Sequence, residues 1–155
     1  MLPPCSFTLP DNRAAFRIEG RGRPIVLLHH ATEDVGLGHS LVERMRGSYR
    51  LIAIDLHSGG AMPAASDALD DVALVEGVLR VGLLPGERFH LVGLGHGARV
   101  AFELSQRRPQ RLHSLLLFEN VEADRAVAVS RLVDRMIRGA DALELPLPSR
   151  MALHG

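Results

Sequence analysis

Short runs of consecutive apolar residues alternate along the chain with helical patterns. The runs cover residues 25–28, 51–54, 89–92 and 115–118. Because they are continuous rather than interrupted by polar positions, they indicate parallel strands covered on both faces. Between them, apolar residues recur every three to four positions, which predicts amphipathic helices. This order predicts an α/β fold with an open, mainly parallel sheet and helices on both faces.

The two ends of the chain add to this array. Residues 6–9 and 14–18 flank the turn-forming Pro10, Asp11 and Asn12 and predict an N-terminal hairpin. Apolar positions over 129–137 predict a last helix, which Gly139 is placed to cap. From residue 145 the chain has two prolines and no periodicity, so we expect a loop or a docking tail there. We therefore predict a single domain over residues 1–155, with the core sheet in 6–121, the helix in 122–140 and the tail in 141–155.

Composition excludes several functions. The 18 basic and 18 acidic residues balance, so no net field attracts nucleic acid or an anionic membrane. All the basic residues are arginine, which excludes a Schiff-base lysine or a phosphate-loop lysine. No apolar run approaches the roughly 20 residues that span a bilayer, and the N-terminus resembles no signal peptide. We expect a cytoplasmic protein without nucleic-acid or membrane partners, in which Cys5 is an incidental thiol.

The most informative segment is a glycine-rich turn. The apolar run 89–92 leads into Gly93, Gly95 and Gly97, and a helical pattern follows. Such a turn places backbone N–H groups of a helix N-terminus where they can stabilise negative charge. One interpretation is a nucleophile elbow, G-x-S-x-G, in which Gly95 stands in the place of the serine while Gly93, Gly97 and Ala98 supply the small flanking residues.

The chain resembles the α/β-hydrolase superfamily in the order of its motifs. The resemblance rests on 25–29 before the oxyanion loop, on 51–55 with Ser58, Gly59 and Gly60, on 89–98 at the elbow, and on 111–119. Residues 86–91 and 100–104 are similar to thioesterases of polyketide and peptide assembly lines. The resemblance implies a shortened hydrolase fold with a hairpin at its start. Members carry Ser, Cys or Asp where this chain has Gly95, and Gly where it has His30.

The resemblance also implies that a catalytic acid and histidine follow on later strands, and this chain stops before them. Glu119 at a strand end and His154 in the tail are the remaining candidates. The alternative interpretation is dinucleotide or methyl-donor binding, since Gly93-x-Gly95-x-x-Ala98 matches G-x-G-x-x-G/A and Glu119 lies about 20 residues further on. A third interpretation gives the glycines only a packing role.

Other polar residues gather at expected strand ends. His29 and His30 end the first parallel strand, where open α/β sheets bind ligands, and are expected near His96. Three imidazoles there suit acid/base chemistry or a divalent metal, although their spacing matches no metal motif and we predict neither metal nor cofactor. Asp55 is expected to hold the turn after its strand. Three further histidines, His57, His90 and His113, are expected to be surface or packing residues.

These observations lead to two functional hypotheses. The first is a non-hydrolytic protein that binds a small acyl-type ligand or a protein partner around His29, His30, Gly95 and His96. The second is an enzyme with His96 or His30 as its base and Glu119 as an acid. A homodimer is expected, because the strand at 115–118 leaves an open sheet edge and the helix at 129–137 has an apolar side.

Overall fold

The protein folds around one seven-stranded sheet. The computed structural model describes residues 5–8, 14–30, 35–56, 67–119, 123–142 and 149–153. The strand order is β1-β2-β4-β3-β5-β6-β7. The strands are β1 (Cys5–Thr8), β2 (Ala14–Gly20), β3 (Arg23–His30), β4 (Tyr49–Leu56), β5 (Phe89–Leu94), β6 (Leu112–Phe118) and β7 (Ser149–Leu153). The five strands β4, β3, β5, β6 and β7 pair in parallel. Their carboxyl ends therefore lie side by side at one end of the strands, which is called the carboxyl edge of the sheet.

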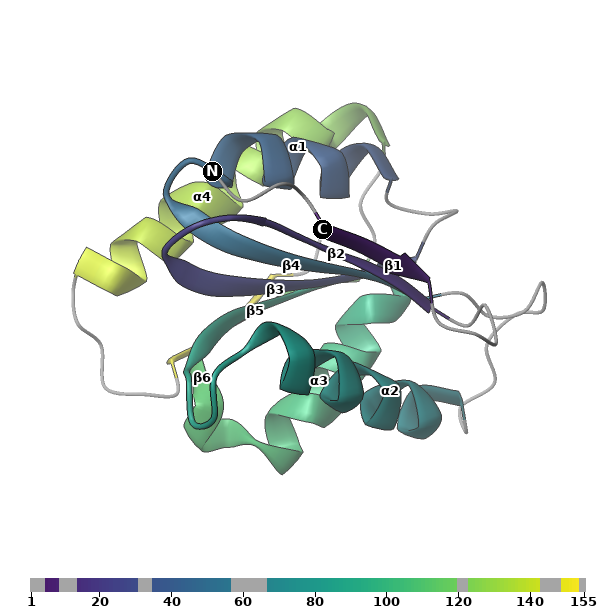
Figure 1. The fold of residues 1–155 in the computed structure, drawn as a ribbon. Helices are drawn as coiled ribbons and strands as arrows, with labels where there is room; N and C mark the ends of the chain where they lie inside the picture. The colour runs from purple at the N-terminus through teal and green to yellow at the C-terminus, as the bar shows by residue number, and fades with distance from the viewer. Residues whose placement is uncertain are drawn as a thin grey trace.

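Four α-helices cover both faces of the sheet. They are α1 (Val35–Met45), α2 (Asp67–Gly82), α3 (His96–Arg107) and α4 (Ala126–Ala142). Figure 1 shows α1 and α4 above the sheet and α2 and α3 below it. Short 3₁₀ turns, Pro109–Arg111 and Ala123–Arg125, precede β6 and α4. The predicted α/β class, the parallel strands and the N-terminal β1–β2 hairpin are confirmed.

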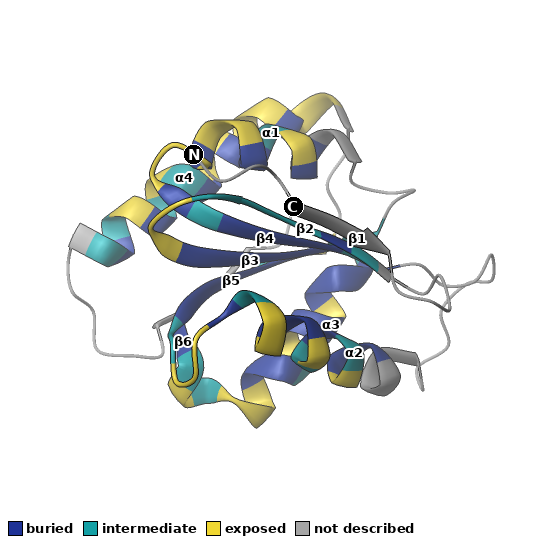
Figure 2. Ribbon diagram, viewed as in Figure 1, coloured by how far each residue is buried: buried dark blue, intermediate teal, exposed yellow. Residues whose placement is uncertain are grey.

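The two faces of the sheet carry separate apolar cores. Along β3, Val26 faces the core under α2 and α3, whereas Ile25 and Leu27 face the core under α1 and α4. This alternation follows from the two-residue period of a strand. It explains why the central strands read as continuous apolar runs, since both faces are covered (Figure 2). No helix in the described ranges is long and apolar enough to cross a membrane.

The C-terminal part of the chain differs from the expectation. Helix α4 runs through Gly139 to Ala142, so Gly139 does not cap it. The segment expected as a loop or docking tail contains β7, which pairs in parallel with β6. Its two prolines, Pro146 and Pro148, precede the strand and do not interrupt it. The β6 edge is therefore covered, which removes the edge argument for a homodimer. The homodimer itself stays a prediction.

Candidate functional site at the β5–α3 turn

Gly95 connects β5 to α3 in a backbone conformation that few residues adopt. Its dihedral angles are φ 56° and ψ −122°, a region that glycine enters without steric cost and other residues enter with strain. The Gly95 N–H donates to the carbonyl oxygen of Phe118 at 2.7 Å, and the Ala98 N–H donates to the Gly95 carbonyl at 3.0 Å. The turn is thus fixed from both sides, by β6 and by the first turn of α3.

The small residues around Gly95 let α3 approach the sheet closely. A Cβ atom added to Gly97 would lie 2.1 Å from the carbonyl oxygen of Leu28 at the end of β3. A Cβ atom added to Gly93 would lie 2.6 Å from the Cα of Ala98. Both distances are well below van der Waals contact, so both positions require glycine. Close packing of α3 against the sheet is therefore one role of these glycines.

The N-terminus of α3 brings backbone donors to the carboxyl edge of the sheet. His96 and Gly97 are the first two helical residues, and the first N–H groups of a helix have no acceptor within the helix itself. The helix dipole adds partial positive charge at the same point. A carbonyl or carboxylate oxygen placed there would find the donors that an oxyanion site needs.

His96 also forms a buried pair with an acid that the sequence analysis did not select. Its Nε2 lies 2.9 Å from Oδ2 of Asp71 on α2, and both side chains are less than a tenth exposed. Because a carboxylate only accepts hydrogen bonds, Nε2 carries the proton that is donated to Asp71. In the neutral ring, Nδ1 is then the basic nitrogen. The His30 ring meets the His96 ring edge to face, with 6.3 Å between centroids.

His29 and His30 lie on opposite faces of β3, so the structure does not bring all three imidazoles together. The His29 ring lies under α1, where a Cβ atom on Gly38 would be 3.7 Å from it. There it lines a cavity of about 310 Å³ together with Asp55, which is its register partner on β4. Strand alternation, which sends consecutive side chains to opposite faces, is the physical reason. The turn that Asp55 was expected to hold, residues 58–60, lies outside the described residues.

Glu119 directly follows β6 and is exposed. Since Leu94 pairs with Phe118 in the sheet register, Glu119 comes next to the Gly95 turn along the same edge. His57 and His154 lie outside the described residues. Within the part of the chain that the structure describes, no group of three or more His, Cys, Asp or Glu side chains is placed to hold a metal ion.

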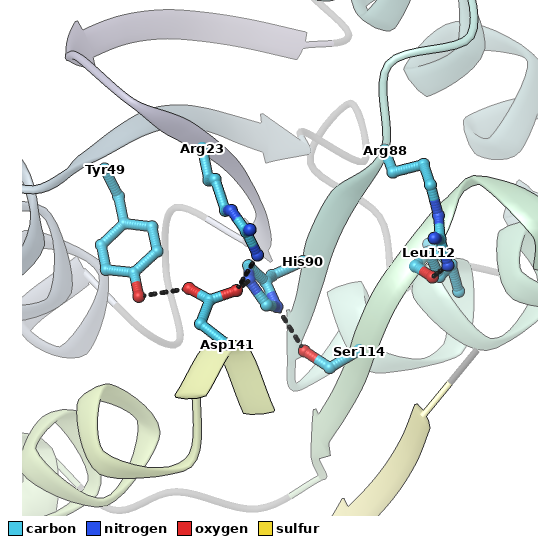
Figure 3. A network of polar contacts seen from close by, with 7 residues as sticks. All are labelled: Arg23, Tyr49, Arg88, His90, Leu112, Ser114 and Asp141. Carbon is cyan, nitrogen blue, oxygen red and sulfur yellow. Dashed lines mark hydrogen bonds and ion pairs between the residues drawn. The ribbon is translucent and has the colours of Figure 1, made fainter. Parts of the chain in front are cut away.

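A second polar cluster lies at the amino ends of the parallel strands, next to the end of α4 (Figure 3). Asp141 accepts hydrogen bonds from Tyr49 Oη at 2.6 Å, from Arg23 Nη1 at 2.7 Å and from His90 Nε2 at 3.0 Å. The other His90 nitrogen, Nδ1, lies 2.6 Å from Ser114 Oγ. In the neutral ring this nitrogen accepts a hydrogen bond from the Ser114 hydroxyl. Ser114 and His90 are fully buried. The order Ser-His-Asp resembles a catalytic triad, but a buried hydroxyl is inaccessible to substrate, so the cluster fastens α4 to four strands.

The protonation states of this cluster follow from its burial. Burial lowers the pKa of His90 despite the opposing influence of Asp141, so the ring is held neutral. Burial and the neighbouring His90 lower the pKa of His113 to about 4. Burial raises the pKa of Asp141, but hydrogen bonds from Tyr49 and the nearby His90 and Arg23 outweigh it, and the net pKa lies below the usual value. His90 and His113 are thus packing residues, as predicted, although His90 has partners that the sequence did not reveal.

One signal in the sequence points to both missed acids. Asp71 is four residues before Val75 and eight before Leu79, on the buried face of α2. Asp141 stands four residues after Ile137 and eight after Val133, on the buried face of α4. A carboxylate at a position that helical spacing buries requires a hydrogen-bonding partner. That partner is a histidine in both cases.

The arrangement of sheet, helices and glycine turn defines the class of fold: the chain has a shortened α/β-hydrolase fold. Its fold is similar to that of a laboratory-evolved variant of potato epoxide hydrolase, with a TM-score of 0.59 and 21% identity, over 75% of this chain and 40% of that one. It is likewise similar to a haloalkane dehalogenase from Bradyrhizobium elkani, with a TM-score of 0.57 and 23% identity, over 77% and 42%.

Curated relatives give a narrower comparison. The chain is 35% identical over 98 residues to pimeloyl-[acyl-carrier protein] methyl ester esterase of Aeromonas hydrophila, covering 63% of this chain and 37% of the relative. It is 33% identical over 107 residues to the protein of the same name from Nitrosomonas europaea, covering 67% and 40%. The chain thus spans about two fifths of the length of these relatives. No family model matches it. The comparisons favour the hydrolase interpretation over the dinucleotide-binding one.

Proposed function

We propose that the chain binds an acyl-type ligand through a carbonyl or carboxylate oxygen at the β5–α3 turn, without hydrolysing it. The observation that carries this proposal is the conformation of Gly95. The backbone has the strained strand-to-helix turn that presents a nucleophile in the superfamily, and the residue at its apex has no side chain to attack with. What stands there instead is a pair of helix N-terminal donors.

The physical consequence of this substitution is binding in place of turnover. Backbone donors fixed by the fold stabilise an anionic oxygen without reorganisation. Without a nucleophile, acyl transfer loses several orders of magnitude in rate, and the remaining donors contribute a much smaller residual effect. The acyl class of ligand is supported by the curated relatives, which are named pimeloyl-[acyl-carrier protein] methyl ester esterase. Thioesterase-like recognition is a narrower form of the same proposal.

A second candidate function is supported by the His96–Asp71 pair. An imidazole that donates its Nε2 proton to a carboxylate keeps a basic Nδ1 in the neutral ring. Such a base acts on water, so hydrolysis through His96 needs no serine. In this alternative, His30 lies beside His96 as the second imidazole, and Glu119 follows at the same edge.

Two substitutions of His96 separate the backbone from the side chain. His96→Ala keeps the N–H and removes the imidazole, whereas His96→Pro removes both, and proline is tolerated at the first helical position. We expect butyrate to shift the His96 and Gly97 amide resonances of the 155-residue chain. Butyrate should bind to His96→Ala with little loss and to His96→Pro several-fold more weakly. Equal binding to both variants, or binding without a shift of these amides, would refute the proposal.

A homodimer and a cytoplasmic location complete the proposal. Since β7 covers β6, the homodimer is now supported by exposed apolar residues of α4: Val127 and Leu132 are 48% and 37% exposed. Light scattering at micromolar concentration tests the oligomeric state, and a strictly monomeric chain would rule the homodimer out. Cell fractionation tests the location.

A further inference from the structure

A cavity larger than the one beside His29 lies at the amino ends of the parallel strands, away from the Gly95 turn. It has a volume of about 520 Å³ and lies between the C-terminal ends of α2 and α3 and the start of β5. Because β5 is six residues long, the cavity is about 20 Å from the turn. The volume falls within the range of sites that bind small organic molecules. The cavity therefore lies outside the proposed acyl site, and the inference below is independent of that proposal.

The cavity combines an apolar floor with a basic rim. The floor is made by buried aliphatic and aromatic side chains, namely Leu79, Leu83, Phe89 and Leu104. Leu84 is 67% exposed at the mouth, so an apolar ligand would cover a side chain that now faces solvent. The rim carries three guanidinium groups, of Arg80, Arg108 and Arg111, against the single carboxylate of Glu76. The charged groups of the lining leave a net charge of +2.

Two of the three arginines contact a neighbouring oxygen atom through their Nε. Arg111 donates from Nε to the Glu87 carbonyl oxygen at 2.9 Å, and its guanidinium lies 6.0 Å from the centroid of the Phe89 ring. Arg108 Nε faces Glu76 Oε1 at 3.4 Å. A guanidinium has four further N–H donors on its two terminal nitrogens. Among the residues that the structure describes, no acceptor is paired with those nitrogens in either arginine, so both are oriented and still able to bind a ligand.

We propose that this cavity binds an amphipathic carboxylate, with its alkyl chain on the leucine and phenylalanine floor and its head group on the arginine rim. A planar carboxylate matches the fork of a guanidinium and accepts two parallel hydrogen bonds from it. The alkyl chain gains from burial in proportion to its apolar area. Glu76 opposes the head group, because it neutralises Arg108 and repels a second carboxylate.

The test measures binding of octanoate by calorimetry to the 155-residue chain and to its His96→Pro variant, in which the proposed acyl site is weakened. Acetate, octylammonium and octyl phosphate are the comparison ligands. We expect octanoate to bind, acetate to bind far more weakly because it lacks the chain, and octylammonium not to bind because of its charge. Equal binding of octylammonium and octanoate, or no octanoate binding at millimolar concentration, would overturn the proposal. Binding of octyl phosphate tenfold tighter than octanoate would overturn the assignment of a carboxylate head.

Variants of the rim give changes of opposite sign. Arg108→Gln should weaken octanoate binding about tenfold, as expected for loss of a charge-assisted hydrogen bond. Glu76→Gln should strengthen it several-fold, which a purely structural role of the Arg108–Glu76 pair does not predict. Arg99→Gln removes an exposed charge from the same helix outside the cavity and should leave the affinity unchanged. Equal effects of Arg108→Gln and Arg99→Gln would show that only overall charge matters and would refute the site.

Discussion

Removing Asp141 should destabilise the protein, because this side chain joins α4 to the sheet. It accepts hydrogen bonds from Arg23 of β3, Tyr49 of β4 and His90 of β5. It also lies at the C-terminal end of α4, where the helix dipole disfavours a negative charge. Helix propensity therefore does not explain an acid at this position, and the three donors do. We predict that Asp141→Ala lowers the free energy of unfolding.

The magnitude follows from what each donor loses. His90 is fully buried, and leaving its Nε2–H without an acceptor costs about 1–3 kcal/mol. The hydroxyl of Tyr49, a buried residue, adds about 1 kcal/mol. The Arg23 side chain is 54% exposed, and an exposed ion pair contributes about 0–1 kcal/mol. Relief of the unfavourable dipole interaction returns about 0.3–1 kcal/mol. The net loss is about 1–5 kcal/mol, a substantial part of the 5–15 kcal/mol typical of a domain.

Urea unfolding followed by circular dichroism at pH 7 measures this loss. The matched control is Asp134→Ala, which removes an acid of the same helix. Its partner Arg138 is 46% exposed and lies four residues further along the helix, so the expected cost is about 0.3–0.5 kcal/mol. Asp141→Asn keeps one acceptor oxygen and should fall between the two, which keeps the test informative if Asp141→Ala does not fold. A loss below about 1 kcal/mol for Asp141→Ala, or one equal to that of the control, would refute the anchoring role.

Three further predictions concern acid, close packing and the strained turn. The pKa of His113 is lowered to about 4 in the fold from an ordinary value of 6.5, so the unfolded chain binds the proton first. The free energy of unfolding should fall as the pH drops from 6.5 to 4, and it should fall less steeply in His113→Gln. Urea unfolding across that pH range measures both slopes, and the same slope in the variant contradicts this prediction. Gly97→Ala places a Cβ atom 2.1 Å from a β3 carbonyl oxygen and should lower the melting temperature strongly. A Cβ atom added to Gly77 on α2 would have no neighbour within 4 Å, so Gly77→Ala should raise stability by about 0.5–1 kcal/mol. Similar melting temperatures for Gly97→Ala and Gly77→Ala would contradict the packing described. Gly95→Ser should lower stability by about 1–3 kcal/mol through its backbone conformation. It should give no strong esterase activity in a chromogenic assay, because a serine hydroxyl is a weak nucleophile until a base takes its proton. A rate close to that of intact esterases would contradict this.

The order of elements and the glycine turn could be predicted from local patterns. Continuous apolar runs identify covered parallel strands, and the spacing of Gly93, Gly95 and Gly97 identifies a turn where helix and sheet approach closely. Both signals lie within a few residues of one another, so they need no knowledge of tertiary structure. The side of β3 that each of His29 and His30 faces also follows from strand alternation, once the strand is placed.

The remaining features depend on contacts between distant segments. His90 and Asp141 are 51 residues apart, and His96 and Asp71 are 25 apart, so each pair forms only when a helix packs at one particular place on the sheet. β7 carries no alternating or continuous apolar pattern from which to predict a strand. Its backbone hydrogen bonds with β6 define it, and sequence periodicity does not report such bonds.

Binding without hydrolysis at the Gly95 turn is tested most directly by the turnover of chromogenic acyl esters and thioesters by the 155-residue chain and by His96→Ala, measured side by side. We predict no turnover above the buffer rate in either protein, because the Gly95 turn has backbone donors and no nucleophile. Turnover by the unaltered chain that is lost in His96→Ala would contradict it. That result would assign hydrolysis to a water molecule activated by the His96–Asp71 pair.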